Sequence, residues 1–152
     1  MLSNSILARL ESQYLSMAEI ISDADESRIH FHPALGKWSI HDNIAHLARY
    51  SVVFQERVRK ISSEDEQTFP RYKAEDDSEF PDWQKMKTRD LISSIEVEHE
   101  KIFSFAKSIS ETDLKRVGVH PRFERLTVIS WLEFFLLHEA QHMFTVFQLA
   151  KG

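Results

Sequence analysis

The chain has 152 residues, of which 42% are hydrophobic, a formal net charge of −5 and no cysteine. This length and apolar content predict a single domain over residues 1–152, built around one core. The acidic balance gives nucleic-acid phosphates no general attraction, so nucleic acid is not expected as a partner. Without cysteine there is no disulfide framework and no thiolate ligand, so any metal must be bound by His, Asp or Glu.

The sequence shows no signal for a membrane or for secretion. No stretch reaches the roughly 18 consecutive apolar residues of a membrane span, and residues 1–5 lack the basic and apolar regions of a signal peptide. A cytoplasmic protein without membrane contact is therefore predicted.

Apolar residues recur at helical spacing in four long stretches. The predicted helices run from Ser3 or Ser5 to about Ser22, from Ile40 to about Ile61, from Thr88 to about Ile109, and from Leu126 to Ala150. No stretch shows the alternation of a strand, and the segment Asp23–Trp38 is predicted to be a structured loop. The three glycines and four prolines stand between these helices or at the C-terminus. The predicted fold class is all-α: a four-helix bundle with long inter-helix connections.

Helix starts carry recognisable caps. Ser39 and Asp42 form a variant of the capping box at the start of the second helix. Thr88 and Thr127 are predicted N-caps of the third and fourth helices.

Residues 62–82 contain eight acidic and two basic residues, and thus hold the whole negative excess of the chain. A charge run of this kind is usually a solvated loop, and the alternative is an acidic docking site. The aromatic residues in and next to this segment argue against disorder. They are Phe69, Tyr72, Phe80 and Trp83.

The fourth predicted helix contains two histidines four residues apart, His138 and His142. Side chains at this spacing lie on one helical face, about 5–6 Å apart at Cβ, and can bind one cation together. A catalytic zinc site usually takes a third protein ligand and leaves one position open. The pair therefore predicts a metal site with another ligand elsewhere in the chain.

Four histidines are candidates for the third ligand: His46, His99, His41 and His120. His99 lies in an apolar stripe, where a core histidine is the more common finding. His41 is expected to be solvated, and the loop residue His120 to serve capping or packing. His46 belongs to a stripe that can face the fourth helix, which favours it without deciding the matter.

The segment 138–142 also matches the H-E-x-x-H pattern of zinc peptidases, in which the Glu activates a water molecule. The longer metzincin form has Gly and His where this chain has Thr145 and Gln148. No sheet is predicted before the helix. A peptidase is therefore disfavoured.

Several of these motifs, in this order, resemble the DinB-like (YfiT-like) metalloenzyme family. Gly36-Lys37-Trp38-Ser39-Ile40 followed by His46-Leu47 resembles the G-x-W-[ST]-(x)6-H-[LA] start of that family's second helix. His120-Pro121-Arg122-Phe123 and Leu126-Thr127, which lead into the His138–His142 pair, resemble the start of its fourth helix. The resemblance covers essentially the whole chain.

The resemblance implies a four-helix bundle that holds one divalent metal ion, zinc or nickel, through His46, His138 and His142. It further implies a small-molecule substrate, with transfer of a low-molecular-weight thiol as the hypothesis for the reaction. A metal-dependent hydrolase and a non-catalytic metal-binding or interaction module are the alternatives. No general base is identified, because Glu139 points about 100° around the helix from His138.

The chain departs from the family pattern at two places. Relatives often have Gly where Glu124 or Arg125 stands, and Gln where this chain has Thr145. The second difference puts the substrate in question more than the metal.

The fourth helix is apolar almost all round, with Trp131, Leu132, Phe134, Phe135, Leu136, Leu137, Met143, Phe144, Val146 and Phe147. A bundle helix needs only one apolar stripe for its own core. The excess predicts a homodimer through this helix, as is common in the family. The alternative is that aromatic residues of the acidic segment cover it within one chain.

Overall fold

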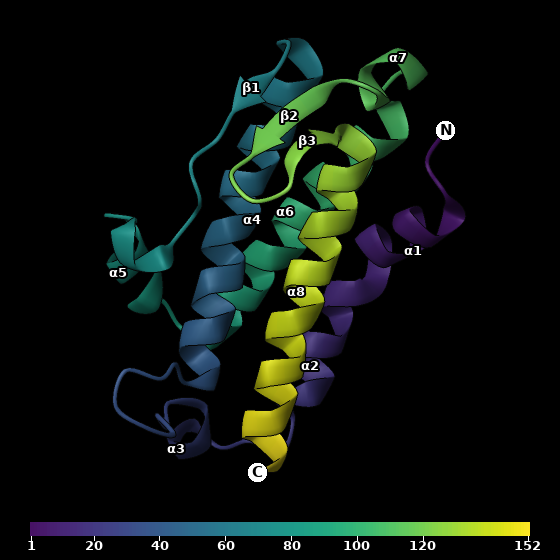
Figure 1. The fold of residues 1–152 in the computed structure, drawn as a ribbon. Helices are drawn as coiled ribbons and strands as arrows, with labels where there is room; N and C mark the ends of the chain where they lie inside the picture. The colour runs from purple at the N-terminus through teal and green to yellow at the C-terminus, as the bar shows by residue number, and fades with distance from the viewer.

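The computed structural model describes residues 1–152 and has four long helical stretches packed as a bundle (Figure 1). The first stretch consists of α1 (Asn4–Ser12), the 3-10 turn η1 (Gln13–Leu15) and α2 (Ser16–Ile20). The other three are α4 (Ile40–Ser63), α6 (Thr88–Ser108) and α8 (Val128–Lys151). The predicted four-helix bundle is therefore confirmed.

The first stretch is not the single helix that the spacing predicts. It breaks at Ser12, which has φ −137°, and continues as η1. The break turns Gln13 toward α8, where its Nε2 donates to the backbone oxygen of Leu136 and to Oε1 of Glu139. The helix is interrupted here by a 3-10 turn, and Gln13 forms contacts with α8 instead. The spacing of apolar residues alone does not predict such a break.

Two of the three predicted caps are confirmed. Ser39 and Asp42 form a reciprocal capping box, and the Thr127 side chain accepts from the amide of Ser130. Thr88 is instead the first residue of α6, which has no side-chain cap. Its hydroxyl bonds to Nδ1 of His41 at 2.8 Å.

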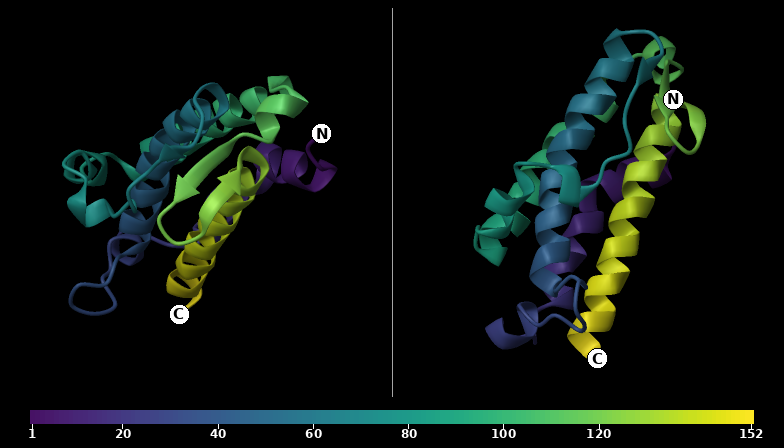
Figure 2. Two further views of the ribbon diagram at one scale, coloured as in Figure 1. Left: turned by 45° about the horizontal axis from the view of Figure 1, so that its top comes forward. Right: turned by 60° about the vertical axis from the view of Figure 1, so that its left-hand side comes forward.

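A small three-stranded sheet forms where no strand was predicted. β1 (Gln67–Thr68) pairs in parallel with β2 (Val117–His120), which pairs antiparallel with β3 (Glu124–Thr127). The hairpin of β2 and β3 packs against α8, and β2 also packs against α4 (Figure 2). These strands are too short, and their burial too irregular, to produce an alternating pattern.

Two residues of the hairpin explain its local sequence. Gly118 allows close packing, because a Cβ there would lie 2.5 Å from Ile61 Cδ1 and 2.8 Å from Trp131 Nε1. Glu124, at the end of the hairpin loop, has a left-handed φ of +56°. That conformation favours glycine, so Glu124 is held there with some backbone strain.

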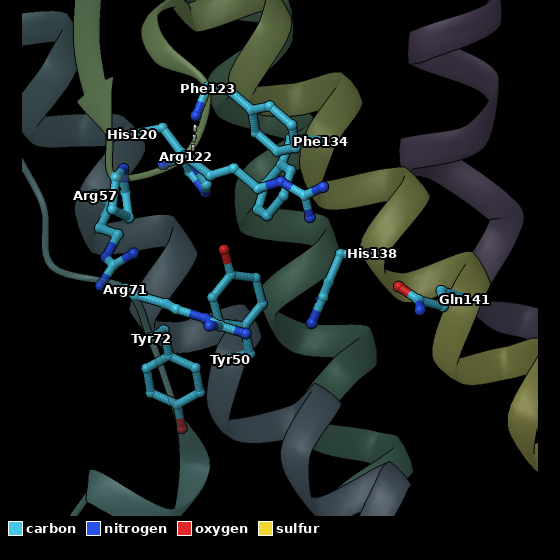
Figure 3. Close-up of a pocket in the computed structure, with 11 residues that line it drawn as sticks. Tyr50, Arg57, Arg71, Tyr72, His120, Arg122, Phe123, Phe134, His138 and Gln141 are labelled. Carbon is cyan, nitrogen blue, oxygen red and sulfur yellow. Dashed lines mark hydrogen bonds between the residues drawn. The ribbon is translucent and has the colours of Figure 1, made fainter.

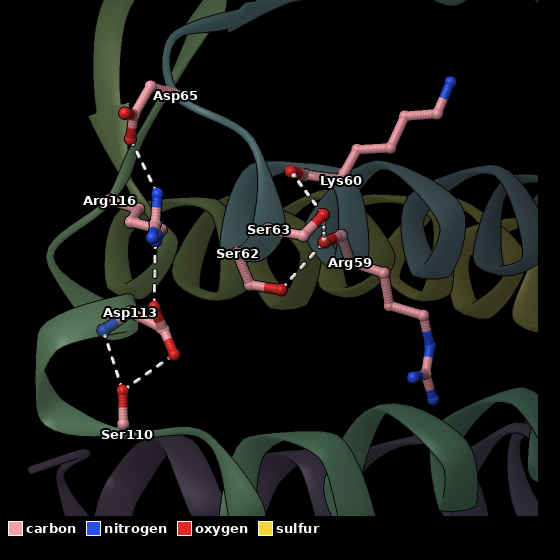
Figure 4. Close-up of polar contacts among 8 residues, drawn as sticks. All are labelled: Arg59, Lys60, Ser62, Ser63, Asp65, Ser110, Asp113 and Arg116. Atoms are coloured by element: carbon pink, nitrogen blue, oxygen red, sulfur yellow. Dashed lines mark hydrogen bonds and ion pairs between the residues drawn. The ribbon is translucent and has the colours of Figure 1, made fainter.

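The connections contain short helices, namely α3 (Glu26–Ile29), the 3-10 turn η2 (Ala74–Asp76), α5 (Phe80–Gln84) and α7 (Glu111–Leu114). The acidic segment is partly bound to the bundle rather than wholly solvated. Arg116 bridges Asp65 of this segment and Asp113 of α7 (Figure 4). Arg49 likewise bonds to Asp77 at 2.7 Å.

The core consists of two clusters of buried apolar residues, one toward each end of the bundle. α4 and α8 pack side by side and run in opposite directions (Figure 1). The beginning of α4 therefore lies level with the second half of α8, which sets the height of the candidate site. No helix of the chain combines the length and apolar character that a bilayer crossing requires.

Candidate metal centre

Three histidines from two helices converge between α4 and α8. Nε2 of His46 lies 3.2 Å from Nε2 of His138, and one ring nitrogen each from His46, His138 and His142 lies within 4.8 Å of the others. Two nitrogens that bind zinc at about 2.0–2.1 Å in a tetrahedral arrangement lie about 3.3 Å apart. The arrangement therefore fits a single metal ion of this size.

The nitrogen atoms of His46 and His138 have few hydrogen-bond partners in the protein. The Nδ1 atoms of His46 and His138 are buried and have no hydrogen-bond partner in the protein. Their Nε2 atoms contact only each other. Buried polar groups are normally satisfied, so this pair is poorly served by protein atoms alone. A cation between the rings would use the lone pairs of both Nε2 atoms.

Asn43 orients the third imidazole. Its Oδ1 lies 2.9 Å from Nδ1 of His142, and its own amide donates to the backbone oxygen of Ser39. Since Oδ1 can only accept, Nδ1 of His142 carries the proton and Nε2 presents its lone pair. A fixed tautomer of this kind is typical of metal-binding histidines.

All three imidazoles are neutral at pH 7. Burial and the neighbouring His142 and His138 lower the pKa of His46 to about 2. Burial, with a contribution from His142, lowers the pKa of His138 to about 3, and burial lowers that of His142 to about 4. Neutral rings keep the lone pairs that a cation needs.

Aromatic rings pack around His46. Around His46, ring centroids lie 5.0 Å away for Trp38, 5.7 Å for Tyr72 and 6.0 Å for Tyr50. These rings lower the local polarity around the imidazole, which strengthens electrostatic interactions there. Trp38 and Tyr72 come from connections outside the four main helices, which bring them over the start of α4.

The other candidate ligands are bound elsewhere. His99 is fully buried, and its nitrogens bond to the backbone oxygen of Leu10 and to Glu139. His41 is 5% exposed, not solvated as predicted, because its nitrogens bond to Thr88 and to the backbone oxygen of Gln84. The Nδ1 atom of His120 accepts from two amides of the hairpin loop.

Glu139, the acid of the H-E-x-x-H pattern, lies on the other side of α8 from the cluster. It is 1% exposed, and its two oxygens bond to His99 and Gln13. A carboxylate held in this way is not free to take a proton from a water molecule beside His138. The structure therefore argues against the peptidase reading of this segment.

One side of the cluster opens into a cavity of about 600 Å³, here called the site cavity (Figure 3). His138 contributes to its wall, so a molecule in the cavity can reach the cluster. The lining contains no Asp or Glu. It consists of Tyr50, Arg57, Arg71, Tyr72, His120, Pro121, Arg122, Phe123, Phe134, His138 and Gln141.

Sequence reasoning missed several residues of this site. Asn43 and Tyr50 stand three residues before and four residues after His46, so helical spacing could have found them. The cavity arginines Arg57, Arg71 and Arg122 could not have been found by spacing, because they come from α4, from the acidic segment and from the hairpin loop.

Comparison with known proteins places the chain in a family. It is 25% identical to the uncharacterised protein YuaE of Bacillus subtilis (strain 168) over 130 residues, which cover 78% of this chain and 80% of that protein. The fold is similar to that of YfiT from Bacillus subtilis, described as a probable metal-dependent hydrolase with an unusual four-helix bundle topology. The TM-score is 0.86 at 17% identity, over 99% of this chain and 89% of YfiT.

A second solved structure, a DinB-like protein (YjoA) from Bacillus subtilis, matches with a TM-score of 0.65 at 16% identity. That match covers 97% of this chain and 90% of YjoA. At these identities the two structures establish the shared fold. The model of the DinB superfamily matches residues 9–146, and the chain therefore belongs to the DinB superfamily.

Proposed function

We propose that the chain is a metal-dependent hydrolase in which His46, His138 and His142 bind one divalent cation. The observation that carries the proposal is the convergence of three neutral imidazoles beside an open cavity. The similarity to YfiT, described as a probable metal-dependent hydrolase, supports the same reaction class. Imidazole ligands suit zinc and nickel, and these are the proposed metals.

The residues around the histidine cluster have different roles in the proposed reaction. A divalent cation held by three imidazoles supplies a Lewis acid that polarises a substrate oxygen and lowers the pKa of a water or thiol group beside it. Asn43 fixes the His142 tautomer, and the ring of Trp38 packs against that of His46. The site cavity admits a small-molecule substrate to the open side at His138. That access supports a catalytic rather than a purely structural role.

Transfer of a small thiol is the second candidate reaction. It is favoured by the absence of Asp and Glu from the cavity lining, since no carboxylate is available there to take a proton from an attacking water. A thiol has an ordinary pKa of about 8.5 and becomes a nucleophile with less help than water needs. A low-molecular-weight thiol and an electrophilic acceptor would then be the two substrates.

Metal analysis tests the site. After loading with zinc or nickel, the protein and the control His30→Ala, which alters an exposed loop histidine, should hold one metal ion per chain. His46→Ala should hold far less. Equal metal content in His46→Ala and the unmodified protein would exclude His46 as a ligand.

Activity assays separate the reactions. The metal-loaded protein is assayed on a panel of small esters and amides, and separately on thiols with an electrophilic acceptor. Metal-dependent cleavage without thiol supports the hydrolase, and turnover that requires thiol supports the transferase. If the metal is bound but no substrate of either panel turns over, the non-catalytic module becomes the better explanation.

We also propose a homodimer through α8. Leu137, Phe144 and Phe147 are 59%, 60% and 44% exposed and are not covered by the acidic segment. Burial of such a face against a second copy is most simply achieved by a two-fold contact. Light scattering at micromolar concentration tests this, because a mass near 17.9 kDa would show a monomer.

A further inference from the structure

Three arginines line the site cavity without a carboxylate partner. Arg71 and Arg122 form no ion pair and no side-chain hydrogen bond, and Arg57 donates only to the backbone oxygen of Pro70. Elsewhere in the chain, Arg49 and Arg116 each bond to an acidic side chain. In a chain of net charge −5, this cavity thus concentrates three positive charges that no protein group neutralises.

The three side chains come from separate segments and surround the ring of Tyr50 (Figure 3). The guanidinium groups of Arg57 and Arg122 lie over the rings of Phe69 and Phe123, at 5.2 and 5.4 Å from the ring centroids. His120 lines the same cavity, and burial together with the charges of Arg57 and Arg122 lowers the pKa of this histidine.

Tyr50 adds a hydroxyl donor to the same space. Tyr50 is only 3% exposed. Its hydroxyl forms no hydrogen bond with another protein group and points into the cavity (Figure 3). Burial raises the pKa of Tyr50 to about 12, so the hydroxyl keeps its proton at pH 7. Because Tyr50 lines the cavity, this hydroxyl is available to a molecule bound there.

His120 supplies a second donor to this space. Its Nδ1 accepts from the amides of Arg122 and Phe123, so in the neutral ring the proton is on Nε2. That Nε2 atom has no protein partner, and the residue lines the cavity. Charged and neutral donors therefore gather at one site, and no carboxylate side chain lines the cavity to accept from them.

We propose that the site cavity binds the oxyanion group, a phosphate or a carboxylate, of a small organic molecule, through Arg57, Arg71, Arg122 and the Tyr50 hydroxyl. Guanidinium groups bind both kinds of oxyanion through two parallel hydrogen bonds. Phe123 and Phe134 give an apolar surface for the organic part. The further step, that this molecule is the substrate, rests on the proposed function. If the histidine cluster holds a catalytic metal, the end of the molecule away from the oxyanion would react there.

The experiment is calorimetric titration of inorganic phosphate, phenyl phosphate and benzoate into metal-free and zinc-loaded protein. The variants are Arg71→Ala, Arg122→Ala and Tyr50→Phe, and the control is Arg89→Ala, which removes one exposed positive charge outside the cavity. Each arginine variant should weaken anion binding by about tenfold, and the control should leave it unchanged. If Arg122→Ala alters the hairpin, the result for Arg71→Ala decides, because Arg71 is exposed and lies outside the hairpin.

Tighter binding of phenyl phosphate assigns a phosphate group, and tighter binding of benzoate assigns a carboxylate. Failure of all three probes to bind would overturn the proposal. So would binding that needs zinc and is the same in the arginine variants, because the anion would then bind the metal alone.

Metal content, measured on these variants and on His46→Ala, separates the anion site from the metal site. Loss of metal in His46→Ala with anion binding retained would show that the two sites are distinct. Anion binding that depends on the arginines in a protein that binds no metal would overturn the proposed hydrolase and leave the anion site standing.

Discussion

Nε2 of His99 lies 2.5 Å from Oε2 of Glu139, inside the core and on the side of α8 away from the histidine cluster. Nδ1 of His99 bonds to the backbone oxygen of Leu10, which can only accept, so this nitrogen carries a proton. A hydrogen bond joins Nε2 of His99 to the Glu139 carboxyl group. The pair ties α8 to α6, and Gln13 extends the tie to the first helical stretch.

Replacement of Glu139 by Gln should therefore destabilise the fold rather than remove a catalytic group. We expect a loss of about 1–2 kcal/mol in the free energy of unfolding, since a neutral amide replaces the buried carboxyl group that bonds to His99 and Gln13. Urea unfolding and metal analysis measure the two effects, with the exposed Glu96→Gln as the control. A variant as stable as the unmodified protein, with metal bound but turnover abolished, would instead identify Glu139 as the base.

Asn43→Ala should weaken metal binding without removing a ligand. The change frees His142 to rotate and to adopt the other tautomer, and loss of such an orienting partner usually costs about 10–100-fold in metal affinity. Competition with a chromogenic chelator measures the affinity. Thr145→Ala is the control, because the Thr145 hydroxyl bonds only to the backbone oxygen of Gln141. Equal affinities for the two variants would contradict the role given to Asn43.

Asp42 should make stability depend on pH in the acid range. Burial alone would raise the pKa of this carboxyl group, but hydrogen bonds from the Ser39 backbone, Gln84 and the Ser39 hydroxyl bring it below its ordinary value of 3.8. The unfolded chain then binds the proton more readily than the folded one. The contribution is present above the unfolded pKa and is lost as the pH falls through the folded pKa.

The measurement compares Asp42→Asn with the unmodified protein by urea unfolding at several pH values. At pH 7 the variant should be less stable. The difference should shrink as the pH falls below about 4, the ordinary range of an Asp carboxyl. A difference that stays constant to the lowest pH at which the protein folds would show that the charge of Asp42 does not matter.

Glu124→Gly should stabilise the hairpin, whereas Arg125→Gly should destabilise it. Glu124 has a φ of +56°, which glycine adopts without strain, so we expect a gain of up to about 1 kcal/mol. Arg125 pairs with Val119 in the strand and forms an ion pair with Glu66, so glycine there loses both. Thermal unfolding of the two variants gives the signs, and a loss of stability in Glu124→Gly would contradict the strain argument.

Local features of the chain were predictable because they depend on neighbours in sequence. The capping box of Ser39 and Asp42 and the shared face of His138 and His142 follow from spacings of three and four residues. The hairpin was not predictable in this way. Its four-residue strands gain their stability from α4 and α8 rather than from an alternating pattern of their own.

Helical periodicity acts within a few residues, and it was therefore enough to predict the helical bundle, two of its caps and the His138–His142 pair of the candidate site. Only the tertiary structure brought His46 to 3.2 Å from His138, 92 positions away, because that distance depends on the antiparallel packing of α4 and α8. It also buried His41, turned Glu139 into the core and gathered three unpaired arginines at one cavity. Each of these contacts joins segments far apart in the chain, and packing between helices fixes them.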